Sequence, residues 1–532
     1  MAIKELRFLL RHSSVYGLGT IFAQAAGFLL LPFYTNYLTP ADYGVAAIVE
    51  TSIAIIGVML SMGLHQAIAR FYAEGSESEA RDLVISTSYI FTALISLPFV
   101  PMLLLVSAPL SELLFKRSDY GTFFMLSSLG LFMGFFVQVG LTYLVLKARS
   151  STYVLVTISN TVMLILLNVY FIAFKGTGLI GIFYSALIAK TTYAVLLSAP
   201  ILMKTGLGFS FGLGLRMIWF AIPLGFSTIF RIITNESDKL FINYFFSPFE
   251  TGIYAVAVKI ATGVHLLLTM TFVQSFQPIR YQIAKEEGGP RTYGSIFEQY
   301  LLAIGAFGLF LSIFSDEIIR LMTAEEFYTS AMFIPPLILS WIMFGSKYHL
   351  ENGILLSMKS RYIFYISGVS SAVNIILNIL LIPRWGLWGA VLSSNVSNAI
   401  LAGASFVVSQ RFYRIDIRWF KVMKLAACIS VCFALSILAS RLDTLMSFAA
   451  KLAIMAGFCG SVFALGLIEM EVFLPLTRKL FPAGQHSRAH AGPLGRDGIG
   501  PAQEPGPGGV KAAGRRGRRK AARIAQASGE GR

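Results

Sequence analysis

Long apolar stretches separated by short polar connections fill the chain from about residue 14 to about residue 470. The first stretch, residues 14–38, contains no charged side chain. A bilayer core about 30 Å thick needs about 20 such residues in a helix, since each residue adds about 1.5 Å. The pattern predicts an all-α membrane protein with about fourteen transmembrane helices. They are expected near residues 14–38, 44–64, 84–107, 121–145, 152–174, 178–202, 217–246, 252–274, 296–315, 331–356, 362–382, 386–409, 419–440 and 447–470.

Composition excludes a water-exposed fold of this size. Hydrophobic residues make up 56% of the chain and charged residues 13%, whereas soluble domains carry about 25% charged residues. The first apolar stretch follows Lys4, Arg7 and Arg11 but is about twice as long as a signal-peptide core, so we interpret it as a retained helix. The sequence shows no metal-ligand cluster, nucleotide-binding loop or long extracytoplasmic loop. We therefore expect a transporter rather than an enzyme, without catalytic residues, metal or cofactor.

Basic residues near the ends of the expected spans predict the orientation. Nineteen Lys and Arg residues fall on the side of the N-terminus and seven on the opposite side. Because cytoplasmic loops carry the excess of positive charge, the N-terminus is predicted to be cytoplasmic, and an even number of spans places the C-terminus there too. The predicted location is the bacterial inner (cytoplasmic) membrane.

The last segment, residues 475–532, differs in composition from everything before it. It is rich in Gly, Ala, Pro and Arg and contains a basic run from Arg515 to Lys520. Such a segment cannot bury enough apolar surface to fold, so we predict a disordered basic tail that is attracted to anionic membrane lipids. It lacks the aromatic side chains on which single-stranded nucleic acids stack, and no nucleic-acid partner is expected.

An internal repeat divides the apolar region. Two pairs of motifs share one spacing of 208 residues: Thr39-Pro40-Ala41-Asp42-Tyr43-Gly44 with Ser247-Pro248-Phe249-Glu250-Thr251-Gly252, and Gly178 and Gly181 with Gly386 and Gly389. A shared spacing implies a duplicated six-helix unit, and because six is even the two copies are parallel repeats. The predicted domains are residues 1–205, residues 206–412, two additional helices in residues 413–474, and the tail.

The repeated motifs are typical of architecture rather than of chemistry. Thr39 and Ser247 are good N-cap residues, and the prolines that follow them suit the first helical position. Asp42 and Glu250 stand where an acid can bond back to the cap and favour the positive end of the helix dipole. The glycine pairs allow helices to approach closely in a membrane.

The first span and its counterpart resemble a known family. Residues 29–38, Leu-Leu-Leu-Pro-Phe-Tyr-Thr-Asn-Tyr-Leu, run directly into the Thr39-Pro40 turn, and residues 222–254 form the equivalent region of the second copy. Over residues 1–474 this pattern is similar to the polysaccharide (Wzx-like) flippases of the MOP superfamily. The resemblance implies transport of a polyprenyl-pyrophosphate-linked oligosaccharide to the outer leaflet by alternating access. The product would be a surface polysaccharide such as lipopolysaccharide O-antigen or exopolysaccharide. Implied partners are the lipid-linked oligosaccharide, membrane lipids, H⁺ or Na⁺ as coupling ion, a polysaccharide polymerase and glycosyltransferases.

Ionisable side chains inside the expected spans are the functional candidates, because each is costly in a membrane unless it is paired or hydrated. Arg231, Asn235 and Asp238 share one face of the seventh span and predict a hydrated cavity, whereas Glu236 lies on another face. The predicted substrate-binding residues are Arg231, Lys239, Lys259, Lys347, Lys190 and Asn235. The predicted ion-coupling residues are Asp238, Glu50, Glu351 and His265.

Other interpretations remain open from the residues alone. The numbers of acids and bases within the spans are nearly equal. In this interpretation some pairs, above all Lys347 with Glu351, neutralise one another and have a purely structural role in holding helices together. A multidrug or metabolite antiporter of the same superfamily would need carboxylates that face a cationic cargo. A flippase for the peptidoglycan lipid precursor would share the fourteen-span layout. The sugar, the coupling ion and the oligomeric state do not follow from the sequence.

Overall fold

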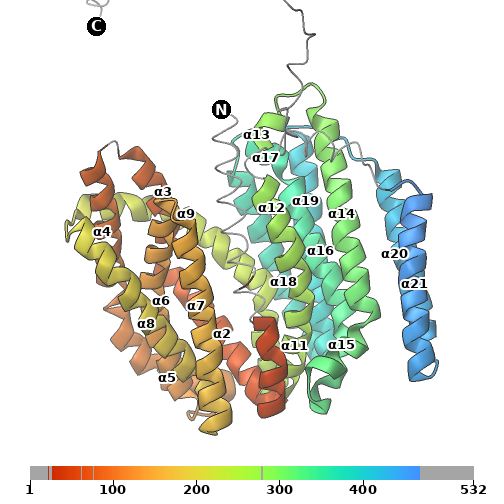
Figure 1. The fold of residues 1–532 in the computed structure, drawn as a ribbon, viewed down its shortest axis with the longest axis horizontal. Coiled ribbons are helices and arrows are strands. Elements are labelled where there is room, and N and C mark those ends of the chain that lie inside the picture. The colour runs from red at the N-terminus through yellow and green to blue at the C-terminus, as the bar shows by residue number, and fades with distance from the viewer. Residues whose placement is uncertain (1–21, 23–26, 62, 76, 277–279, 468–532) are drawn as a thin grey trace, which may run out of the picture. The chain divides into compact units, whose positions relative to one another are not determined.

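The computed structural model describes residues 22, 27–61, 63–75, 77–276 and 280–467, which contain helices and no strands (Figure 1). The described part of the first helix covers residues 27–37. The next helices are α2 (Pro40–Ser61), α3 (Leu64–Glu74), α4 (Ser78–Ser96), α5 (Phe99–Phe115), α6 (Gly121–Leu146), α7 (Ser150–Asn168), the π-helix η1 (Val169–Phe174), α8 (Ile180–Thr205), α9 (Phe211–Glu236) and α10 (Asp238–Phe245). They are followed by α11 (Pro248–Val264), the π-helix η2 (His265–Thr269), α12 (Met270–Phe276), α13 (Arg280–Ile283), α14 (Gly289–Ile313), α15 (Ser315–Met322), the 3₁₀-helix η3 (Glu325–Phe333), α16 (Ile334–Leu350), α17 (Asn352–Leu356), α18 (Arg361–Trp385), α19 (Leu387–Gln410), α20 (Trp419–Ala439) and α21 (Thr444–Ala464).

The predicted all-α membrane fold is confirmed. Among the described residues, thirteen helical segments are long and apolar enough to cross a membrane, and they correspond to the second to fourteenth expected spans. The first expected span lies mostly outside the described residues, as do the last residues of the 413–474 segment and the tail predicted for residues 475–532. The fold is therefore that of a polytopic membrane protein.

The local interruptions of the helices were not predicted. The expected seventh span divides at Ser237 into α9 and α10. Two spans end in or contain π-helical turns, η1 and η2. Apolar content predicts a span but not such a turn, because the turn depends on which backbone groups the neighbouring helices contact.

The packing repeats as the sequence does. α8 contacts α6 and α7, and α19, which lies 208 residues later, contacts α16 and α18 in the same way. Gly178 and Gly386 both adopt left-handed backbone conformations, with φ of 62° and 56°. Gly181 and Gly389 each pack so closely on the preceding helix that a Cβ would overlap it. The equivalent glycines therefore have the same role in each copy: one adopts a positive φ, and the other allows close packing on the preceding helix.

α9 packs in two directions. Its first half, including Leu213, Met217 and Ala221, belongs to a hydrophobic cluster with α3, α4 and α8. Its second half contacts α18, where Ser371 Oγ donates to the carbonyl of Phe230 at 2.8 Å. Pro223 lies between the two halves and removes a helical hydrogen bond there. α9 thus joins helices of the first predicted unit to helices of the second.

Two ion pairs attach the last two helices to α14 and α15. Arg418, directly before α20, donates through Nη2 to Glu298 Oε2 of α14 at 2.5 Å. Lys451 of α21 is 2% exposed, and its Nζ lies 2.8 Å from Glu317 Oε1 of α15. An apolar cluster that includes Leu309, Phe314, Leu425 and Phe458 fills the space between these helices.

Candidate functional site

Arg231 and Lys347 line one cavity. Its volume is about 190 Å³, and its walls come from α3, α9, α16, α18 and α19. Gln66 of α3, Ser227 and Thr228 contribute further polar groups. The Arg231 side chain is exposed, and it forms no hydrogen bond or ion pair within the residues that the structure describes. An unpaired guanidinium beside a second cation suits a multiply charged anion, because its planar fork matches phosphate oxygens.

Lys347 is shared between this cavity and a buried acid. Its Nζ lies 3.7 Å from Glu351 Oε2, with side-chain exposures of 15% for Lys347 and 9% for Glu351. That distance exceeds a hydrogen bond, and Glu351 Oε2 has no hydrogen-bond partner among the described residues. The pair is loose enough for Lys347 to contact a ligand without leaving its acid.

His265 lies in η2, against the aromatic side of α16. Its ring centroid is 5.0 Å from Trp341 and 5.1 Å from Phe344, and the residue is 6% exposed. Its Nδ1 has no hydrogen-bond partner in the described part of the chain. The structure therefore places this predicted ion-coupling residue in an aromatic packing environment.

Asp238 and Asn235 lie inside the second predicted unit rather than on the cavity wall. Asp238 is 2% exposed, and its carboxylate accepts hydrogen bonds from the Tyr254 hydroxyl and, at 3.3 Å, from Ser394 Oγ. Asn235 donates through Nδ2 to the Arg231 carbonyl at 2.9 Å and accepts from Asn398 at 3.4 Å. The shared face predicted for the seventh span thus divides: Arg231 lines the cavity, and the other two bind neighbouring helices.

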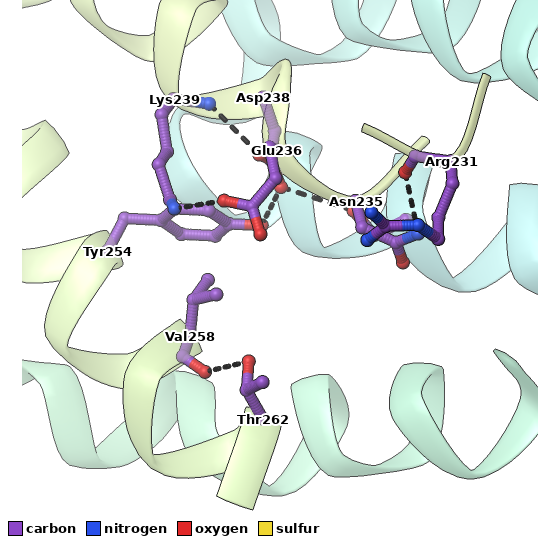
Figure 2. A network of polar contacts seen from close by, with 9 residues as sticks. Arg231, Asn235, Glu236, Asp238, Lys239, Tyr254, Val258 and Thr262 are labelled. Carbon is purple, nitrogen blue, oxygen red and sulfur yellow. Dashed lines mark hydrogen bonds and ion pairs between the residues drawn. The ribbon is translucent and has the colours of Figure 1, made fainter. Parts of the chain in front are cut away.

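Lys239 does not pair with the adjacent Asp238 carboxylate. Its ammonium group binds Glu236, one turn earlier, while its backbone N–H donates to Asp238 Oδ1 at 3.0 Å. Figure 2 shows Lys239 and Glu236 facing one another, with the Tyr254 ring beside them. Lys239, predicted to bind substrate, already has an acid partner, and Glu236 is that partner.

Three further candidates come from other helices. Glu50 of α2 is exposed and lies within electrostatic range of both Lys190 and Lys239. The stem of Lys190 lies along α6, where a Cβ on Gly130 or Gly134 would be 3.7 Å or 3.8 Å from its Cδ. Lys259 of α11 approaches the first helix, and its Nζ would lie 3.0 Å from a Cβ on Gly27. These charges surround the junction of the two copies, but not the cavity that Arg231 lines.

A buried polar seam was missed by the sequence reasoning. Ser237 Oγ donates to Asn374 Oδ1 at 3.2 Å, and Asn378 Nδ2 donates to the same oxygen at 3.0 Å. Asn374 Nδ2 and Asn378 Oδ1 have no partner among the described residues, although both side chains are fully buried. The available signal was the helical spacing of Ser and Asn along residues 367–378 and 393–398. Uncharged polar residues receive little weight in a search for membrane charges, and the seam was overlooked for that reason.

The chain is similar in sequence to a bacterial membrane protein and in structure to solved membrane transporters. The chain is 26% identical over 259 residues to an uncharacterized membrane protein of Haemophilus influenzae, covering 48% of this chain and 60% of that protein. Among solved structures it is similar to the lipid II flippase MurJ in an inward closed conformation, with a TM-score of 0.66, 14% identity, and coverage of 86% of this chain and 100% of that chain. It is also similar to an inward-facing multidrug resistance MATE family transporter of the MOP superfamily, with a TM-score of 0.57, 16% identity, and coverage of 75% and 94%.

By its structure, the chain is a polytopic α-helical membrane protein with the fold seen in MOP-superfamily transporters. The family model described as polysaccharide biosynthesis protein matches residues 36–332, more than half of the chain. The chain belongs to that family, which confirms the resemblance drawn from its first span and repeat. It spans 60% of the length of the curated relative from Haemophilus influenzae.

Proposed function

We propose that this protein is a flippase that moves a polyprenyl-pyrophosphate-linked oligosaccharide from the cytoplasmic to the outer leaflet of the inner membrane. Its product would enter surface polysaccharide biosynthesis. The observation that carries the proposal is a cavity lined by helices of the second repeated unit and by Gln66 of the first. In it the Arg231 guanidinium, unpaired among the described residues, and the loosely held Lys347 lie together. Two cations in a membrane-embedded cavity favour an anionic headgroup over a cationic drug.

Coupling to an ion gradient is proposed to run through Asp238. Its carboxylate, the Ser394 hydroxyl and the Asn374–Asn378 amides offer several oxygen ligands in a buried place. Hard monovalent or divalent cations prefer oxygen ligands, and a proton could instead occupy the carboxylate. The support for coupling is the buried Asn378 Oδ1, an acceptor without a partner among the described residues in the polar cluster that contains Ser237, the neighbour of Asp238, since such an atom normally binds a group or water.

The lipid tail has a proposed place between the last two helices. α20 and α21 form an apolar groove of about 720 Å³, lined by residues such as Val431, Leu435 and Ile454, with Lys424 at one end. An apolar groove with one terminal cation matches a long hydrocarbon chain that ends in phosphate. This groove belongs to the two helices that the internal repeat leaves over.

The decisive experiment is deletion of the gene, scored for surface glycan and for lipid-linked intermediates on the cytoplasmic face. We expect loss of glycan, accumulation of inward-facing intermediates, and recovery with the wild-type chain. Arg231→Ala should fail to restore export, whereas Arg216→Ala should restore it. Arg216 lies on the same helix but does not line the cavity.

The other outcomes separate the rival functions. Normal glycan with altered drug sensitivity would assign the chain to multidrug transport. Loss of viability with failure of cell-wall synthesis would assign it to the peptidoglycan precursor. Full export of glycan by an Arg231→Ala, Lys347→Met double variant, present at normal amount, would show that this cavity does not bind the cargo.

A further inference from the structure

Two hydrogen bonds that link the repeated units are exchanged between equivalent positions. The Thr35 hydroxyl, at the end of the first helix, lies 3.2 Å from the carbonyl of Met322 at the end of α15, and its hydrogen is shared with the Leu31 and Pro32 carbonyls of its own helix, at 3.0 Å and 3.3 Å. Asn243 Nδ2, near the end of α10, donates to the carbonyl of Leu114 near the end of α5, at 2.5 Å. Asn243 follows Thr35 by 208 residues, and Met322 follows Leu114 by the same 208. Each unit therefore offers the other a donor at an equivalent position, an amide from Asn243 and a hydroxyl from Thr35 that its own helix also binds.

A reciprocal close approach lies just beyond these bonds in the chain. α2 and α11 are in contact, and a Cβ on Gly44 would overlap the Pro248 carbonyl, while a Cβ on Gly252 would overlap the Pro40 carbonyl. The four residues are again related by the 208-residue repeat. Only glycine permits two helix backbones to meet this closely.

The capping bonds hold both first turns in place. Thr39 Oγ1 accepts from the Asp42 N–H at 3.2 Å, and Asp42 Oδ2 accepts from the Thr39 N–H at 3.2 Å. Ser247 Oγ accepts from the Phe249 N–H at 3.1 Å and also binds the Glu250 carboxylate. Because these bonds hold each first turn rigid, the two helix N-termini can come together and separate without changing their own structure. A contact that forms and breaks reversibly requires this.

The contact and the cavity lie at different depths. Gly44 lies in the first turns of α2, whereas Gln66, which lines the cavity, lies in α3 beyond the far end of α2, and the helix from Gly44 to Ser61 spans ~25 Å. Thr35 and Asn243 are 2% and 6% exposed, so water does not compete for their bonds in this arrangement. The contacts between the two units thus lie apart from the cations of the cavity.

We propose that these positions form a two-fold latch that closes the outer side of the transport path, with two exchanged hydrogen bonds and two facing glycines. We name Thr35–Met322, Asn243–Leu114 and the Gly44–Gly252 crossing together the exchange latch. The proposal rests on the proposed function, because a path that opens to both sides in turn must break this latch once in each cycle.

The test measures accessibility rather than transport. In a chain whose Cys428, Cys432 and Cys459 are replaced by alanine, a cysteine at Ser227 reports access to the cavity. An impermeant maleimide is applied from the outer side of spheroplasts. Asn243→Leu removes one bond and should raise the labelling rate about five-fold, since a single hydrogen bond shifts an equilibrium by about that factor. Thr35→Val should raise the labelling rate by a smaller factor, because the Thr35 hydroxyl is shared with the Leu31 carbonyl of its own helix.

The glycine variants sharpen the test. Gly44→Ala and Gly252→Ala should raise labelling as well, and the double variant should add little, because separating the helices for one methyl group makes room for the other. Matched controls are Thr192→Val, whose hydroxyl bonds to the carbonyl of Ile188 on its own helix, and Gly403→Ala, whose Cβ would meet nothing within 4 Å in the described structure. Both controls should label like the parent.

Labelling equal to the controls in latch variants that are present at normal amount would overturn the latch. The result is independent of cargo. Increased labelling together with normal surface glycan in the gene deletion would leave the latch in place and reject the flippase function.

Discussion

At the residue scale, the membrane charges differ most in whether they have a partner. Lys239 binds Glu236, and Lys347 is loosely paired with Glu351, whereas Arg231 has no partner among the described residues. Charges that neutralise one another can be purely structural, because a pair is less costly in the membrane than a lone ion. Of these membrane charges, Arg231 is therefore the one that we most expect to contact the cargo.

Asp238 gives a sharp prediction about coupling. Asp238→Asn keeps the size of the side chain but removes its charge, and Tyr254 and Ser394 can still bond to the amide oxygen. We expect the purified protein in proteoliposomes to lose the stimulation of transport by an imposed Na⁺ or H⁺ gradient, while its thermal stability changes little. Ser393→Ala, a neighbour whose hydroxyl bonds to the carbonyl of Gly389 on its own helix, is the control. An unchanged response to both gradients in Asp238→Asn would place the coupling ion elsewhere.

The residues show where sequence reasoning reaches its limit. The sequence predicts that Arg231, Asn235 and Asp238 share a face, because that follows from helical geometry. It does not predict that Asn398 and Ser394 approach that face and withdraw two of the three side chains from the cavity. Tertiary packing decides which helix lies against this face of α9 and α10. The pattern of residues in a single sequence does not predict that packing.

At the element scale, spans are predictable and their attachments are not. Thirteen expected spans match helical segments of the described residues because length and apolar content alone define a membrane helix. The contacts that hold α20 and α21 depend instead on single buried charges, Glu298 with Arg418 and Glu317 with Lys451. Neither Arg418 nor Lys451 is among the site residues that the sequence predicts.

The buried Lys451 predicts an asymmetry between two variants. Glu317→Gln leaves an ammonium group buried without its acid, and such a change typically costs about 3–5 kcal/mol. Lys451→Met removes the buried charge, and Glu317, which is 34% exposed, can turn to water. We expect a large loss of thermal stability in detergent for Glu317→Gln, a smaller one for Lys451→Met, and recovery in the double variant. Equal losses in both single variants, without recovery, would show that the pair does not act as a unit.

At the scale of the whole molecule, the two copies share topology but differ in polarity. The second copy contains the buried seam of Ser237, Asn374 and Asn378, while Glu50 and Lys190 of the first copy correspond by the repeat to Val258 and Asn398. The two copies thus share a helix arrangement and differ in the chemistry of their buried side chains. The domain boundaries predicted near residues 205 and 412 remain a proposal, since α9 packs on helices of both copies.

Orientation in the membrane is testable directly. In the cysteine-free chain, Leu207→Cys lies in the connection between α8 and α9, and Ser440→Cys lies between α20 and α21. Both positions are exposed. The distribution of basic residues predicts that an impermeant maleimide outside intact cells labels Ser440→Cys and leaves Leu207→Cys unlabelled until the membrane is opened. The opposite pattern would invert the proposed direction of transport.

The buried Lys451 also bears on how the protein is made. A lysine at the centre of a membrane helix raises the free energy of insertion by about 2.5–3.5 kcal/mol, and Lys451, in the first half of α21, bears part of that cost. α21 also emerges from the ribosome long after α15. Glu317, which enters the membrane earlier, can receive this ammonium group and lower the cost of inserting α21. Loss of this acid from α15 should therefore lower the fraction of chains in which the last helix is inserted, and with it the amount of protein that escapes cellular quality control.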